Sequence, residues 1–230
     1  PRHPDVVTKG DLIDFTAAFL PAYPTRSQGA QPARADLVRN ALSLDLAALG
    51  KDYLGRARPR FPRGSRFVDK MPLNGLYLGL IAKALPNASI VLVERDPMDT
   101  AVALYTSLFE HAYPWSYDLG EIAEYMSAHH RLMQHWRATL QDRIYPVSYE
   151  QLVRDQEMQT RRLLQHCGLP WRDACLRFFD NPAPCATASA VQVRKPIYSS
   201  SIGRWRRYEQ RLNGLPEWLA PLVAAHARAR

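Results

Sequence analysis

The sequence predicts an α/β protein built on short parallel strands. Residues Ile90–Val93 form a continuous apolar run, which is typical of a parallel strand buried on both faces. Asp96 and Pro97 follow, and they suit the N-cap and the first position of a helix. A second strand is expected at Arg66–Lys70, with a helix at Pro72–Leu85 between the two strands. This order predicts a right-handed crossover between parallel strands of one sheet.

The remaining pattern is mostly helical. We expect helices over residues 11–20, 36–54, 118–140, 156–167, 171–179, 202–212 and 216–230, and a third strand over 143–148. Ser43 is a possible cap inside the second of these stretches. Residues 181–201 show no periodicity, and a loop of this length is often functional. Three strands are few for this many helices, so we expect a further strand before residue 1.

The composition is that of a globular protein with acidic partners. The chain has 230 residues, 47% of them hydrophobic and 23% charged, and a formal net charge of +8. This charge favours a nucleotide, a sulfated or phosphorylated substrate, or nucleic acid. No block of five or six like charges suggests a basic tail. Cys167, Cys175 and Cys185 form no CxxC pair, which predicts reduced thiols in the cytoplasm. No signal peptide and no apolar run of membrane-spanning length is visible, so we expect no membrane span.

Arg95 is the first candidate binding residue. It follows the apolar strand directly and precedes a helix N-terminus. Ligands of open α/β sheets bind at the carboxyl ends of the strands, and anions favour helix N-termini. The alternative is that Arg95 forms an ion pair with Asp96 or Asp99. The residues of this stretch leave both interpretations open.

Three motifs together resemble sulfotransferases. They are Arg95-Asp96-Pro97-x-Asp99, Tyr149-Glu150-x-Leu152, and the run from Gln192 to Tyr198 that leads to Gly203-Arg204-Trp205. The resemblance is strongest to a bacterial branch in which tetratricopeptide repeats often precede the catalytic domain, and which is related to tyrosylprotein sulfotransferases.

The resemblance implies a P-loop-NTPase-like, three-layer fold with a short parallel sheet between helices. It also implies an enzyme that moves a sulfuryl group from 3′-phosphoadenosine 5′-phosphosulfate to an acceptor hydroxyl or amine. The product nucleotide is then adenosine 3′,5′-bisphosphate, and no metal is required. The acceptor is a peptide, a sugar, a lipid or a metabolite, and no motif separates these classes.

The resemblance also implies the cofactor-binding residues. Arg95 takes the place of the family arginine that grips the 3′-phosphate, and Tyr149 matches a tyrosine near the adenine. Arg194 and Lys195 fall in a late loop that closes over the nucleotide, and Ser189 matches a serine near the cofactor. A guanidinium suits a phosphate dianion because it presents a planar fork of donors.

Two catalytic residues follow from the same resemblance. Lys70 lies in a Lys70-Met71-Pro72 stretch and would offset charge on the bridging oxygen. Asp11, in Gly10-Asp11-Leu12, matches the carboxylate that takes the acceptor proton. An alternative role for Asp11 is to cap the helix over residues 11–20.

The sequence departs from the family pattern at two points. Ala103 stands where the family has a serine that contacts the 3′-phosphate, and Thr100 or Thr106 is one turn away. No Gly-rich phosphate loop occurs in the sequence. We therefore expect residues 1–230 to be a sulfotransferase domain that lacks its first strand and its 5′-phosphosulfate loop.

Two other functions remain open. One is a non-catalytic module of the same fold that binds nucleotide or sulfated ligands. The other is a basic nucleic-acid-binding domain, suggested by Trp205 among arginines, although a helix that covers the nucleotide site explains this cluster better.

His129, His130 and His135 lack the spacing of a metal site. Tyr113, Trp115 and Tyr117 either line an acceptor pocket or pack as a satellite core.

Overall fold

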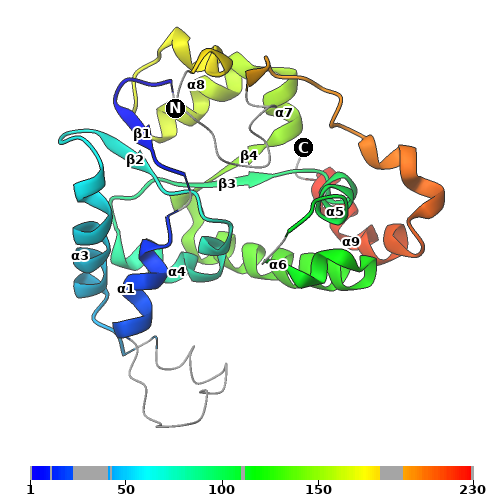
Figure 1. The fold of residues 1–230 in the computed structure, drawn as a ribbon, viewed down its shortest axis with the longest axis horizontal. Helices are drawn as coiled ribbons and strands as arrows, with labels where there is room; N and C mark the ends of the chain where they lie inside the picture. The colour runs from blue at the N-terminus through cyan, green and yellow to red at the C-terminus, as the bar shows by residue number, and fades with distance from the viewer. Residues whose placement is uncertain are drawn as a thin grey trace. The chain divides into compact units, whose positions relative to one another are not determined.

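The computed structural model describes residues 2–10, 12–22, 41, 43–109, 112–181 and 194–228. It divides into two compact units (Figure 1). The N-terminal unit comprises residues 1–88 with 180–190, and the C-terminal unit comprises residues 89–179 with 191–230. Each unit is described by itself.

The N-terminal unit contains one pair of parallel strands and a small helical core. β1 (Val6–Thr8) pairs with β2 (Arg66–Val68), with Val7 opposite Phe67. The helical elements are α1 (Asp14–Ala22), α3 (Leu46–Ala57), the 3-10 helices η1 (Arg58–Arg60) and η2 (Pro72–Tyr77), and α4 (Leu78–Ala84). Their apolar faces enclose a cluster that includes Phe15, Leu49 and Tyr53. Figure 1 shows α1, α3 and α4 gathered around this core.

The helix starts in this unit differ from the sequence prediction. The first helix begins at Asp14 rather than at residue 11. The cap of α3 is Asp45, whose Oδ1 accepts the Ala48 N–H at 2.9 Å, and not Ser43. The helix expected over 72–85 begins as a 3-10 helix, because its first turns hold Asn74 and Gly75, which are poor helix formers.

The C-terminal unit contains the second pair of parallel strands. β3 (Ile90–Glu94) pairs with β4 (Ile144–Ser148), with Leu92 opposite Pro146. Its α-helices are α5 (Pro97–Tyr105), α6 (Leu119–Leu140), α7 (Tyr149–Arg154), α8 (Gln156–His166) and α9 (Leu215–Arg228). Its 3-10 helices are η3 (Pro114–Tyr117), η4 (Gln141–Arg143), η5 (Asp173–Leu176) and η8 (Arg204–Arg211), and η6 (Phe178–Asp180) begins in this unit and ends at the first residue of segment 180–190.

The core of this unit lies between α5, α6 and α9. Val102, Ile122, Leu215 and Leu219 are almost completely buried there, and Trp115 packs against them. Trp115 therefore belongs to a satellite of the core, as one of the two sequence interpretations expected. Figure 1 shows α5, α6 and α9 as neighbouring helices.

The α/β class with short parallel strands is confirmed, but the strands are arranged differently from the prediction. The described strands form two separate two-stranded sheets, because none of them hydrogen-bonds to both β2 and β3. β1 was not predicted, since three residues are too few for a periodicity signal. The stretch 171–179 forms only short 3-10 helices, and the stretch 202–212 forms a 3-10 helix of eight residues rather than an α-helix.

The prediction that β3 is buried on both faces was also wrong. Ile90 is 7% exposed, whereas Val91 is 38% exposed and Val93 is 66% exposed. Within the described part of the chain, β4 is the only hydrogen-bonded neighbour of β3. One edge and part of one face of this apolar strand are therefore open.

Candidate anion site at the end of β3

The turn between β3 and α5 places Arg95 as the sequence predicts. Asp96 is the N-cap of α5, and its Oδ1 accepts the Asp99 N–H at 3.0 Å. Pro97 occupies the first turn, where a missing N–H has no cost. Arg95 therefore follows the last strand residue and precedes the helix N-terminus, where the helix dipole favours an anion.

The acidic neighbours of Arg95 have other partners. Glu94 forms an ion pair with Arg137, with 2.6 Å between Oε2 and Nη2. The two Asp99 oxygens accept backbone N–H groups, and Asp96 caps its own helix. Among the described residues Arg95 has no ion pair, so the proposed pairing with Asp96 or Asp99 is not formed. The charge of Arg95 thus has no acidic counterpart in this part of the structure.

Arg95 is held by one carbonyl and one aromatic ring. Its Nη2 donates to the Ser201 carbonyl at 2.7 Å. Its Cζ lies 5.1 Å from the ring centroid of Tyr149, in cation–π contact. Its Nε is buried and has no hydrogen-bond partner among the described residues. A buried donor without a partner is costly, and a bound acceptor is one explanation for such a group.

Tyr149 opens α7 directly after β4. Ser148 caps α7, because its Oγ accepts the Gln151 N–H at 3.3 Å. The following residue, Glu150, is completely buried, and its Oε1 accepts the Asp96 N–H at 2.7 Å. The ends of β3 and β4 are thereby joined, and Arg95 and Tyr149, predicted as cofactor-binding residues, come together. The sequence did not single out Glu150 for this bond, since its partner lies 54 residues away.

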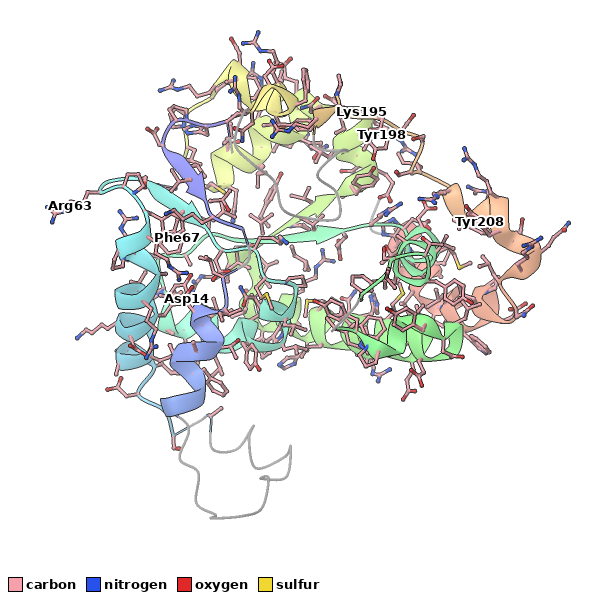
Figure 2. All side chains as sticks on the ribbon, in the orientation of Figure 1. Asp14, Arg63, Phe67, Lys195, Tyr198 and Tyr208 are labelled. Atoms are coloured by element: carbon pink, nitrogen blue, oxygen red, sulfur yellow. The ribbon has the colours of Figure 1, made fainter. Side chains whose placement is uncertain are left out.

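The other predicted cofactor residues are less fully described. Arg194 and Lys195 are exposed and lie in the C-terminal unit, on the stretch before η8. Figure 2 labels Lys195. Ser189 lies outside the described residues. Neither Arg194 nor Lys195 makes a described contact with Arg95.

The predicted catalytic residues belong to the N-terminal unit. Lys70 is exposed and follows β2. Asp11 lies outside the described residues. The residue before Lys70, Asp69, is fixed by two hydrogen bonds: it accepts from Tyr53 Oη at 2.9 Å and from Asn74 Nδ2 at 3.1 Å. Burial, and then the charge of Asp69, raise the pKa of Tyr53 far above its ordinary value, so this hydroxyl remains a donor.

The two threonines near Ala103 are already engaged. Thr100 Oγ1 donates to the Asp96 carbonyl at 2.9 Å, and Thr106 Oγ1 donates to the Val102 carbonyl at 2.8 Å. Each hydroxyl proton is therefore used within α5. Ala103 itself has no hydroxyl, so none is present at this position on the second turn of α5.

The described residues contain no group of three or more His, Cys, Asp or Glu side chains placed to hold a metal ion. His129 lies near Tyr125 in a ladder of rings, and burial, together with His130, lowers the pKa of its imidazole. Within the described ranges, none of the helices combines the length and the apolar character needed to cross a bilayer.

Comparison with known proteins identifies the family. Residues 3–173 match the sequence model of the sulfotransferase family. This chain belongs to the sulfotransferase family, whose fold is P-loop-like. The class predicted from the motifs is therefore confirmed.

The relatives of this chain include two protein-tyrosine sulfotransferases and one uncharacterized protein. The chain is 36% identical over 177 residues to an uncharacterized protein of Aquifex aeolicus (strain VF5), with 76% of this chain and 23% of that protein covered. It is 24% identical to a protein-tyrosine sulfotransferase of Drosophila melanogaster, with 73% and 37% covered. It is 28% identical to protein-tyrosine sulfotransferase 1 of Danio rerio, with 73% and 52% covered. The chain thus spans about half or less of the length of each relative.

Proposed function

We propose that this protein transfers a sulfuryl group from 3′-phosphoadenosine 5′-phosphosulfate to an acceptor hydroxyl or amine. The observation that carries the proposal is the set of contacts made by the Arg95 guanidinium. Among the described residues the guanidinium lacks an acidic partner and its buried Nε lacks a hydrogen-bond partner, and its Cζ lies 5.1 Å from the ring centroid of Tyr149. Family membership supports sulfotransferase chemistry, and the arginine supports a phosphorylated nucleotide as its ligand.

The residues present fit such a donor. Arg95 would hold the 3′-phosphate through its guanidinium, with added attraction from the N-terminus of α5. Tyr149 would lie next to the adenine, while Arg194 and Lys195 would cover the nucleotide from the later segment. When bound, the donor supplies an activated sulfuryl group and a phosphate leaving group.

Two residues are proposed to assist the transfer. The Asp11 carboxylate would accept the proton of the acceptor hydroxyl or amine, which makes the acceptor a better nucleophile. The Lys70 ammonium would offset negative charge at the leaving phosphate. The hydrogen bonds of Asp69 with Tyr53 and Asn74 fix the backbone next to Lys70. Since the charges come from side chains, this scheme requires no metal.

The domain is proposed to be completed by a further strand. β3 has an open edge within the described part of the chain, and Val93 beside that edge is 66% exposed. A parallel strand that pairs with β3 would satisfy the edge, and the loop after it would carry backbone amides to the 5′-phosphosulfate. Association with upstream tetratricopeptide repeats and a cytoplasmic location remain predictions.

The direct test is calorimetric titration with adenosine 3′,5′-bisphosphate. We expect binding by the parent chain that Arg95→Ala abolishes. Arg162→Ala is the matched control, because it removes an exposed arginine of α8 in the same unit and should leave binding unchanged. Absence of binding, both by this chain and by a chain extended upstream, contradicts the proposal.

A second function is favoured by one observation. Ala103 offers no hydroxyl, and the neighbouring threonine hydroxyls are used within α5, so the site lacks a contact that the family pattern has. This favours a non-catalytic module that binds nucleotide or a sulfated ligand. Binding without sulfuryl transfer to any class of acceptor, by a chain that carries a phosphate loop, would establish this alternative.

A further inference from the structure

A buried carboxylate on α5 holds the segment at the start of η8. Asp99 is only 2% exposed, and each of its oxygens accepts a backbone N–H of that segment. The Gly203 N–H donates to Oδ2 at 2.6 Å, and the Trp205 N–H donates to Oδ1 at 3.0 Å. Because both donors are charge-assisted partners of one carboxylate, they fix this short segment firmly on the helix.

The same segment supplies the carbonyl that holds Arg95. Ser201, two residues before Gly203, accepts from Arg95 Nη2 at 2.7 Å. Gly203 between these contacts has φ of +69°, a left-handed conformation that glycine adopts without strain. The carbonyl bound to Arg95 and the amides bound to Asp99 therefore belong to one tight turn.

These contacts leave the Arg95 guanidinium little freedom. One end donates to the Ser201 carbonyl, and Cζ lies 5.1 Å from the centroid of the Tyr149 ring. The buried Nε has no partner among the described residues. Release of the Ser201 carbonyl would let the guanidinium rotate about its side-chain torsions, and Nε would then lose its defined position.

We propose that Asp99 is a positioning residue for Arg95. It acts through the Ser201–Trp205 turn, and it sets the guanidinium in the orientation that takes the 3′-phosphate. This inference rests on the proposed function for the identity of the ligand. The arrangement itself, an aspartate that orients an arginine through backbone groups about one hundred residues away in sequence, is a property of the described contacts.

The first test needs no ligand and follows the Arg95 Nε–H group by NMR. We expect a resolved signal that exchanges slowly with water in the parent and disappears in Arg95→Ala, which assigns it. In Asp99→Asn one oxygen is replaced by a donor, so one of the two amide bonds is lost. The Nε–H signal should then move toward that of exposed arginines and exchange at least about tenfold faster.

Matched variants separate this effect from general loss of stability. Asp118→Asn removes an N-cap carboxylate from α6 and should leave the Arg95 signal in place. Gly203→Ala perturbs the same turn by straining its backbone, so it should also shift the Arg95 signal. It replaces Asp99→Asn as the test if Asp99→Asn does not fold. The control for Gly203→Ala is Gly168→Ala, which should leave the Arg95 signal in place. Gly168 also has a positive φ, +59°, but it follows α8. An unchanged Arg95 signal in both Asp99→Asn and Gly203→Ala overturns the inference.

The second test measures nucleotide preference, the ratio of affinities for adenosine 3′,5′-bisphosphate and adenosine 5′-monophosphate. Asp99→Asn should lower this ratio by about tenfold, and it should lower it no further in an Arg95→Ala background. An equal loss for both nucleotides would show that Asp99 merely stabilises the fold. If Arg95→Ala itself leaves the ratio unchanged, or no nucleotide binds, the proposed function fails while the NMR result still decides the positioning role.

Discussion

The Glu150 carboxylate accepts a hydrogen bond from the backbone N–H of Asp96 across 2.7 Å. The bond joins the start of α7 to the turn that carries Arg95. The other carboxylate oxygen lies 3.2 Å from Ser148 Oγ and 3.5 Å from His226 Nε2 on α9. A single buried side chain therefore connects two strand ends and the C-terminal helix of one unit.

Removal of this carboxylate should be costly. Glu150→Ala leaves the Asp96 N–H buried without its partner, and we expect the free energy of unfolding to fall by about 2–3 kcal/mol. Glu150→Gln keeps one acceptor and the volume of the side chain, so its loss should be smaller. Urea denaturation measures both. The control is Glu157→Gln, an exposed i,i+4 partner of Arg161, which should change stability little. Similar losses in all three variants would contradict this role of Glu150.

The end of α6 can be stabilised by one substitution. Gln141 has φ of +45° and ψ of −119°, a conformation that costs a side-chain-bearing residue about 1–3 kcal/mol. Gln141 is exposed, so Gln141→Gly should raise the melting temperature. Tyr113 also has a positive φ, but its ring contacts Phe109 and Trp115. Tyr113→Gly should therefore lower the melting temperature. The opposite result for Gln141→Gly would contradict the strain at Gln141, and the opposite result for Tyr113→Gly would contradict the stabilising role of the Tyr113 ring.

Stability should fall in alkaline solution through Tyr53. In the unfolded chain this hydroxyl ionises near its ordinary pKa of 10.0, whereas burial and then Asp69 keep it protonated in the fold. Above about pH 10 the unfolded state binds fewer protons than the native state, so the contribution is complete below that pH and is lost as pH rises. The slope is at most about 1.4 kcal/mol per pH unit. Urea denaturation between about pH 8 and pH 11 measures it.

The same experiment on Tyr53→Phe isolates the effect. This variant loses the bond to Asp69 and should be less stable at neutral pH by about 1 kcal/mol, but its alkaline decline should be shallower. Tyr208→Phe, at an exposed tyrosine of η8, should decline like the parent. An unchanged slope in Tyr53→Phe would show that other groups cause the decline.

Restoring a hydroxyl on α5 should strengthen nucleotide binding. Ala103→Ser places an O–H on the second turn of the helix that Arg95 precedes, where a charge-assisted bond to phosphate is worth up to about tenfold in affinity. Ala103→Val adds volume without a donor and is the control. Calorimetry with adenosine 3′,5′-bisphosphate should give tighter binding for the serine variant alone. No gain would mean that the 3′-phosphate does not lie along this face of α5.

Local signals in the sequence predicted the surroundings of Arg95 well. Asp96 and Pro97 specify the start of α5 wherever it packs, because a cap and a preset φ act within one turn. The same holds for Asp118 at the start of α6. The strand before Arg95 was also placed correctly, since a short apolar run depends little on its neighbours.

The other features of the site could be found only in the folded structure. The partner of Arg95 Nη2 is 106 residues away, and nothing in the spacing of Ser201 marks its carbonyl as an acceptor. The exposure of Val93 depends on which strands and helices cover β3, and an apolar run does not contain this information. The 3-10 helix Arg204–Arg211 begins at residues held by Asp99, and local helix propensity contains no information on this distant contact.

The open edge of β3 has a consequence for handling the protein. Among the described residues β3 has a strand partner on one edge only, and a five-residue strand with such an edge and two exposed valines is a template for association with a second strand. Prepared alone, this chain should self-associate at high concentration through β3, and a charged substitution such as Val93→Lys should suppress the association. A strand that pairs with β3 would use the same hydrogen-bonding groups. Solubility is thus a simple readout of whether the sheet has its full set of strands.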